Sequence, residues 1–216
     1  HQTINGNEAI LQMEQAGDYP DIIVGCTGGG SNLAGLMFPF LGQQLRGGQK
    51  IDIIGCEPLS CPSFTKGKYA YDHGDMARMT PLIKMHTLGS DFLPPANHSG
   101  GLRYHGMSYH LSHLYDLGLM RAKAYGQKDC FEAGVLFGKQ EGIIPAPEGN
   151  HAVKGAIDAA LECKEKGESK TILFNLCGHG HFDMLAYMDY FSRKLAEDSF
   201  DTKAFEDSMA SIPAVN

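Results

Sequence analysis

Two short runs of apolar, mostly β-branched residues lie near the start of the chain. The first is Asp21–Cys26 (DIIVGC) and the second is Ile51–Cys56 (IDIIGC). Neither run alternates polar and apolar positions, which is typical of parallel strands that are covered on both faces. A glycine-rich turn follows the first run, and a helical pattern then extends to about Leu45. The order strand, turn, helix, strand predicts a βαβ unit.

The last third of the chain again alternates strand and helix patterns. Asp129 is expected to be the N-cap of the first helix there. The elements expected in order are a strand at Arg121–Gly126, a helix to about Gln140, an extended segment at Glu141–Glu148, a helix from Asn150 to about Lys166, a buried strand at Thr171–Leu176, and a helix from Phe182 to about Ala196. We therefore predict an α/β domain over residues 1–200, with a mostly parallel sheet and helices on both faces, followed by a polar tail at 201–216.

No regular pattern is visible between about Leu59 and Gly118. This stretch holds several prolines, many glycines and six of the ten histidines. A loop this long inside a compact domain is usually functional or only locally helical. We expect an inserted loop region here.

Composition narrows the function classes. The 216 residues are 43% hydrophobic and 20% charged, which is enough apolar material for a core and excludes a disordered chain. The net charge of -7 argues against a nucleic-acid or anionic-membrane binder, and no apolar run is long enough to span a membrane. The six cysteines form no CxxC pair, so we interpret them as buried free thiols in a reducing, cytoplasmic protein.

The glycine turn after the first strand is the strongest candidate for ligand binding. It consists of Gly28, Gly29, Gly30, Ser31 and Asn32. Successive backbone N–H groups before a helix N-terminus form a site for a phosphate dianion, and glycines let the phosphate approach. The pattern is neither GxGxxG nor GxxxxGK[ST], so a dinucleotide or triphosphate is disfavoured. A plain tight turn between strand and helix is the alternative.

A second turn, Cys177–His181 (CGHGH), follows the last strand. Ligands of parallel sheets bind at the carboxyl ends of the strands, so both turns are expected to face one crevice. A zinc site is a competing interpretation of these histidines, but HxH without a third ligand at familiar spacing is a weak signal. The histidines that such a site would use are His179 and His181, with His105, His110 and His113.

Glu148 is the third candidate. It follows the apolar segment Ile143–Pro147 and precedes a helix. A carboxylate beside a buried segment is costly unless it is paired or hydrogen-bonded, which makes it a candidate for catalysis. The alternative is a carboxylate that stabilises the helix through its dipole.

Several motifs together resemble one known family. They are His1-Gln2-Thr3-Ile4, Pro20-Asp21, the Gly28–Asn32 turn, Gly55-Cys56-Glu57-Pro58, Gly101-Leu102, Glu141–Ala146 with Glu148, His151-Ala152, and Asn175-Leu176 with Gly178. In this order they resemble the β chain of tryptophan synthase over nearly the whole chain. Gly101–Gly106 and Gly178–Asp183 are more similar to the second, divergent type of that chain.

The resemblance implies a fold-type II enzyme that uses pyridoxal 5′-phosphate (PLP) to join L-serine, or phosphoserine, to indole and form L-tryptophan. It implies that Gly28–Asn32 bind the cofactor phosphate, that Glu148 lies beside the cofactor ring and steers protonation, and that Cys177 with Gly178 faces the pyridine nitrogen. It also implies a homodimer, and it leaves open an α subunit as partner and a monovalent cation.

Three departures from the family pattern matter. Position 177 is usually Ser, and Cys is a weaker hydrogen-bond donor. Arg103 stands where the ordinary β chain has an Asp that orients the substrate hydroxyl, so Arg103 indicates a more anionic substrate or a different closing contact. The lysine that carries the cofactor belongs to an N-terminal domain that the resemblance places outside these residues. We expect this chain to be the C-terminal half and to be inactive alone, because PLP enzymes need that lysine.

Two alternatives stay open. One is another PLP reaction, such as a serine or threonine deaminase or a different β-replacement, which Arg103 and Cys177 leave possible. The other is an inactive binding domain of a split protein.

Overall fold

The computed structural model describes residues 1–196 and 198–215. Its elements in order are α1 (Ile4–Ala16), β1 (Ile22–Cys26), α2 (Ser31–Leu45), β2 (Asp52–Pro58), β3 (Lys68–His73), β4 (Leu82–Thr87), the 3-10 turn η1 (Gly100–Leu102), α3 (Tyr109–Asp116), β5 (Arg121–Tyr125), α4 (Gln127–Glu141), α5 (Pro147–Lys166), β6 (Ile172–Phe174), α6 (Met184–Phe191) and α7 (Thr202–Ala210).

The main sheet has four strands in the order β5-β2-β1-β6, and every neighbouring pair is parallel. The two apolar runs near the start of the chain form its centre, with Ile22 opposite Asp52 and Cys26 opposite Cys56. All five residues of β1 are buried, as expected for a strand with helices on both sides.

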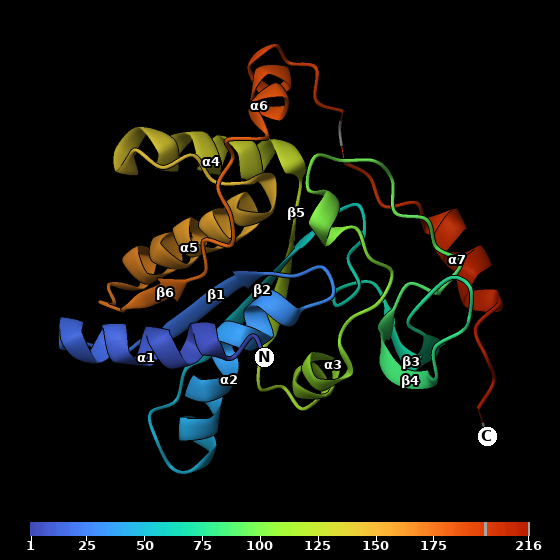
Figure 1. Ribbon diagram of the computed structural model, residues 1–216, viewed down its shortest axis with the longest axis horizontal. Helices are drawn as coiled ribbons and strands as arrows, with labels where there is room; N and C mark the ends of the chain where they lie inside the picture. Colours follow the sequence, from blue (N-terminus) through green and yellow to red (C-terminus); the bar gives the residue numbers. More distant parts are fainter. Residues whose placement is uncertain (197, 216) are drawn as a thin grey trace.

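Helices cover both faces of this sheet (Figure 1). Because side chains alternate along a strand, Ile23 and Ile53 point toward α1 and α2, where they pack in one cluster with Leu33, Met37 and Phe40. Val24 and Ile54 point the other way and pack with Ala159 of α5. The predicted fold class, a mostly parallel sheet with helices on both faces, is confirmed.

Several predicted boundaries are wrong. Gly126, not Asp129, is the N-cap of α4, and Asp129 instead lies in the first helical turn. Helix α5 begins at Pro147 rather than at Asn150. Proline suits the first helical position, because a backbone N–H there would have no acceptor within the helix. Strand β6 is shorter than predicted and only half-buried, since it is an edge strand. Helix α6 ends at Phe191 rather than near Ala196.

The region between Leu59 and Gly118 is more regular than the sequence predicts. β3 and β4 form an antiparallel hairpin in which Lys68 lies opposite Thr87, and α3 follows. The strand sequences KYAYDH and LIKMHT mix charged and apolar residues on each face, so they carry no clear period-two pattern.

The residues expected to form a polar tail contain helix α7. Asp201 is its N-cap and accepts a 2.9 Å hydrogen bond from the backbone N–H of Ala204. Phe200 and Phe205 pack against Leu88 and Phe92 of the 59–118 region, and Figure 1 shows α7 beside β3 and β4. Within residues 1–196 and 198–215, no helix is both long and apolar enough to cross a bilayer.

The six cysteines are all free thiols. Five are buried, as predicted: Cys26, Cys56, Cys61, Cys130 and Cys163. The prediction is wrong for Cys177, which is exposed because it follows the edge strand β6.

Candidate functional site

The glycine turn occupies the carboxyl end of β1 and leads straight into α2. Gly30 is the N-cap of α2 and has φ = 92°, a left-handed conformation that favours glycine. A Cβ at Gly30 would lie 2.4 Å from Leu111 Cδ1. A Cβ at Gly28 would lie 2.7 Å from Leu102 Cα, so the turn is closed against the 100–104 loop. Only glycine fits these two positions.

The N-terminus of α2 suits a phosphate dianion. No side chain caps it. The first N–H groups of a helix have no intrahelical acceptor, so those of Ser31 and Asn32 remain for a ligand. The positive end of the helix dipole points in the same direction. The residues therefore fit an anionic group.

A chain of polar contacts joins the glycine turn to the end of β6. The Asn175 amide donates a 2.6 Å hydrogen bond to Oδ1 of Asn32. Nδ2 of Asn32 donates to Cys26 Sγ at 3.5 Å, and Cys26 Sγ lies 3.3 Å from Cys177 Sγ. The two turns thus meet at one edge of the sheet, as expected. The sequence pattern does not distinguish Asn175 and Cys26 as site residues, although their place at neighbouring strand ends is a signal that could have found them.

The two thiols have opposite pKa shifts. The contact with Cys177, together with burial, raises the pKa of Cys26 well above its usual value. The same hydrogen bond lowers the pKa of Cys177, against the effects of burial and of the nearby Glu148 charge.

Glu148 lies in the first turn of α5, at the same edge of the sheet. Its Oε1 accepts a 2.8 Å hydrogen bond from the backbone N–H of Gly101. The carboxylate is therefore tied to the loop that closes against Gly28. Both interpretations of Glu148 keep support, since it is an acidic residue at a helix N-terminus and also a half-buried carboxylate beside the glycine turn.

Gly178 fixes the second turn against the segment that leads into α5. Its carbonyl accepts a 2.9 Å hydrogen bond from Ala146 N, and Gly180 N donates to Ile144 O at 2.7 Å. A Cβ at Gly178 would lie 3.2 Å from that of Ala146. These contacts hold the Cys177–His181 turn close to Glu148.

Arg103 lies just after η1 and is exposed. Its Nη2 donates a 2.6 Å hydrogen bond to the carbonyl of Pro94. The loop that contains Pro94 therefore holds the guanidinium of Arg103, which lies two residues after Gly101 in the sequence.

The histidines of the alternative zinc site lie in separate places. The rings of His179 and His181 are 4.4 Å apart on the exposed turn. His105 is buried, with Nε2 2.9 Å from the carbonyl of His73, and His110 and His113 belong to α3. In the part of the chain that the structure describes, no three His, Cys, Asp or Glu side chains are grouped to hold a metal ion.

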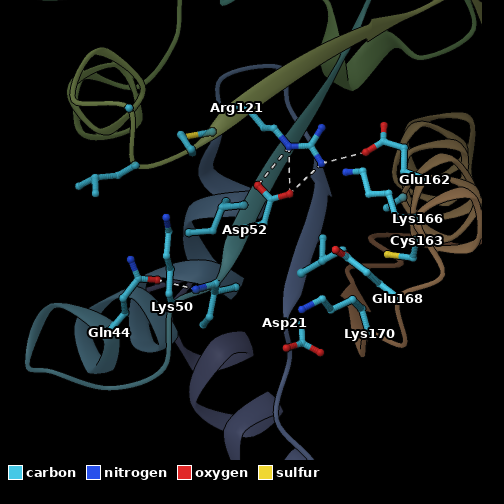
Figure 2. A pocket seen from close by; sticks show the side chains of 17 residues that line it. Asp21, Gln44, Lys50, Asp52, Arg121, Glu162, Cys163, Lys166, Glu168 and Lys170 are labelled. Carbon is cyan, nitrogen blue, oxygen red and sulfur yellow. Dashed lines mark hydrogen bonds and ion pairs between the residues drawn. The ribbon is translucent and has the colours of Figure 1, made fainter.

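A separate cavity of about 530 Å³ lies at the opposite edge of the sheet, where β1, β2 and β5 begin. Figure 2 shows Arg121 between Asp52 and Glu162, with Cys163 nearby on α5. Nη2 of Arg121 lies 2.7 Å from Oδ2 of Asp52. Ligands of parallel sheets bind at the other edge, so the glycine turns remain the candidate site.

Comparison with known proteins decides the family. Residues 4–178 match the family described as pyridoxal-phosphate dependent enzyme. The chain belongs to this family. A chain of the L-serine ammonia-lyase from Rhizomucor miehei has the same fold, with a TM-score of 0.63 and 14% identity over 90% of this chain and 56% of that one. The fold-type II architecture and the PLP dependence implied by the resemblance are thereby confirmed.

The similar curated proteins are tryptophan synthase β chains. "Tryptophan synthase beta chain 2" of Methanosarcina mazei is 56% identical over 90% of this chain and 44% of its own length. That of Aquifex aeolicus is 56% identical over 91% of this chain and 46% of its own. "Tryptophan synthase beta chain" of Pyrococcus horikoshii is 49% identical over 99% of this chain. The resemblance to the second type is confirmed, and the chain spans about half the length of these relatives.

Proposed function

We propose that these residues form part of a PLP-dependent enzyme of the tryptophan synthase β type, which replaces the β-substituent of L-serine or phosphoserine with indole to give L-tryptophan. The identity to three tryptophan synthase β chains over at least 90% of this chain supports the reaction. The single structural observation that carries the proposal is the uncapped N-terminus of α2, closed by glycines against the loop that binds Glu148.

Two turns would bind the cofactor. The backbone N–H groups of Gly28–Asn32 would bind the phosphate, and Cys177 would face the pyridine nitrogen, with Gly178 setting the turn. PLP, when bound, supplies an electron sink for the amino-acid substrate. A thiol leaves the ring nitrogen weakly polarised, as a neutral partner does.

Glu148 would transfer protons. The Gly101 N–H fixes Oε1 of Glu148, which orients the carboxylate. Oε2 would then exchange a proton with the substrate beside the cofactor ring. Arg103 would act at the mouth of the site, where its positive charge favours an anionic substrate such as phosphoserine.

The lysine that bears the cofactor would come from an N-terminal half outside residues 1–216, and the active site would lie between the two halves. We also propose a cytoplasmic homodimer, with an α subunit and a monovalent cation as candidate partners. The family resemblance supports these statements.

The natural full-length protein tests the proposal. After borohydride reduction with PLP, peptide mapping is expected to find the reduced adduct on a lysine outside residues 1–216. Incubation with L-serine or phosphoserine and indole is expected to form tryptophan. Pyruvate from serine, with no tryptophan when indole is present, would favour the deaminase instead. The absence of any adduct would favour an inactive binding domain.

A further inference from the structure

Two thiols from neighbouring parallel strands meet at the candidate site. Cys26 ends β1, and Cys177 follows β6. The two strands are paired through Val24 and Phe174, and Asn175 N donates to Val24 O at 3.1 Å, so the chains still run side by side at this point. The two Sγ atoms are 3.3 Å apart. A disulfide bond needs about 2.05 Å, so the sulfurs must approach by about 1.3 Å to bond.

The surroundings give the two thiols different reactivity. Cys177 is exposed, whereas Cys26 is buried beneath it and also contacts Nδ2 of Asn32. The hydrogen bond with Cys26 lowers the pKa of Cys177, which raises its thiolate fraction. An exposed thiolate with a second thiol within reach is the arrangement of a redox-sensitive cysteine pair.

We propose that Cys26 and Cys177 are a modification site for peroxides, where they form a reversible disulfide bond that disables the cofactor site. The disulfide itself depends only on the geometry of the two thiols. Its effect on the cofactor rests on the proposed function, because Cys177 is there the partner of the pyridine nitrogen.

The chemistry needs only a peroxide. The Cys177 thiolate attacks one oxygen of hydrogen peroxide, the O–O bond breaks, and a sulfenic acid and hydroxide form. The Cys26 sulfur then attacks the Cys177 sulfur, the S–O bond breaks, and water leaves with the Cys26 proton. The hydroxide takes up the proton that the Cys177 thiol lost on ionising. In total, two thiols are oxidised, one peroxide is reduced, and two waters are released. A dithiol reductant reverses the change.

The disulfide would alter the site in two ways. It removes the thiol that would face the ring nitrogen, and it draws Cys26 toward Cys177 and away from Asn32. Asn32 belongs to the turn that would bind the phosphate, so cofactor affinity is expected to fall at least tenfold.

Trypsin separates the two cysteines cleanly. The peptide that contains Cys26 ends at Arg46, and the peptide that contains Cys177 runs from Thr171 to Arg193, each with no other cysteine within residues 1–216. The natural full-length protein is treated with equimolar hydrogen peroxide. The remaining thiols are then alkylated with N-ethylmaleimide, and the protein is digested without reductant. We expect one linked species, two hydrogens lighter than the two peptides together, that dithiothreitol removes.

Variants separate this linkage from general oxidation. Cys26→Ser and Cys177→Ser are each expected to abolish the linked species. The PLP affinity of Cys177→Ser, whatever its starting value, should be the same before and after peroxide. Cys163→Ser is the matched control, because Cys163 lies at the opposite edge of the sheet, and it should form the linkage like the wild type. Unlinked, alkylated thiols or a sulfinic acid on Cys177 in the wild type would overturn the proposal.

PLP titration of the reduced and oxidised protein distinguishes the two proposals. If the linkage forms but reduced protein binds no PLP, the modification site stands and the proposed function fails. If PLP binds equally to the linked and reduced forms, the inferred effect of the disulfide on the cofactor site is wrong.

Discussion

Gly101 and Glu148 are joined by a 2.8 Å hydrogen bond from the backbone N–H to Oε1. Gly101 belongs to the loop that closes over the glycine turn, and Glu148 belongs to the first turn of α5. This bond fixes the orientation of the one carboxylate that the proposed function uses for proton transfer.

Two substitutions separate orientation from proton transfer at Glu148. Glu148→Gln keeps an oxygen that accepts from Gly101 but removes the exchangeable proton. In the natural full-length protein we expect both Glu148→Gln and Glu148→Ala to lower kcat for tryptophan formation by about 100-fold or more. PLP affinity should remain within a few-fold of wild type, as measured by titration. A Gln variant with wild-type kcat would contradict the proton-transfer role.

Gly28→Ala tests the closure of the glycine turn. The new Cβ would lie 2.7 Å from Leu102 Cα, a backbone atom that has little freedom to move. We expect a loss of about 1–3 kcal/mol in the free energy of unfolding, measured in urea, and weaker PLP binding. Gly100→Ala is the matched control, since nothing lies within 4 Å of its Cβ. Equal stability of the two variants would show that the turn can move to make room for the Cβ at position 28.

His151 is expected to make the protein sensitive to acid. It is buried on α5, and burial lowers its pKa from 6.5 to about 4. The folded state binds this proton less readily than the unfolded state does. The contribution of neutral His151 to the free energy of unfolding is therefore complete above pH 6.5 and is lost as the pH falls through about 4. The loss is about 3 kcal/mol. His151→Met should remove this pH dependence from urea unfolding curves, whereas His110→Gln, at an exposed position, should retain it.

Glu57 is expected to act in the opposite direction. Burial raises the pKa of this carboxyl from 4.5 to about 7, although Phe64 N, Thr65 N and the Thr65 hydroxyl all donate hydrogen bonds to it. The contribution of the protonated Glu57 carboxyl to the free energy of unfolding is complete below pH 4.5 and is lost as the pH rises through about 7. The loss is again about 3 kcal/mol. Glu57→Gln does not titrate, so the difference in unfolding free energy between wild type and variant should change with pH over this range; a constant difference would contradict the prediction.

The sequence predicts the core of this fold better than its periphery. Ile22–Cys26 and Asp52–Pro58 are strands whose buried, β-branched residues identify them directly. The β3–β4 hairpin lacks such a pattern, because each face carries both polar and apolar residues and the buried positions include the polar Asp72 and Thr87. Helix α7 is stable through contacts of Phe200 and Phe205 with residues far away in the sequence. Local propensity does not contain that information.

The candidate site is predictable where a backbone requirement selects the residue. Gly28 and Gly30 are visible in the sequence because only glycine fits the turn. Cys26 and Asn175 are not, because their contacts with Cys177 and Asn32 depend on which strands become neighbours. The place of Glu148 in the first turn of α5 similarly depends on where the helix begins, the least certain feature of a sequence pattern.

The close packing of Gly28 against Leu102 has a consequence for the order of folding. The parallel sheet joins β1 to β2 through one helix, but the glycine turn is completed only when the loop that follows the β3–β4 hairpin closes over it. Closing so long a stretch of chain costs entropy before its contacts form. We therefore expect the β1–α2–β2 unit to form first during refolding, and the glycine turn to be completed only afterwards, when this loop closes over it.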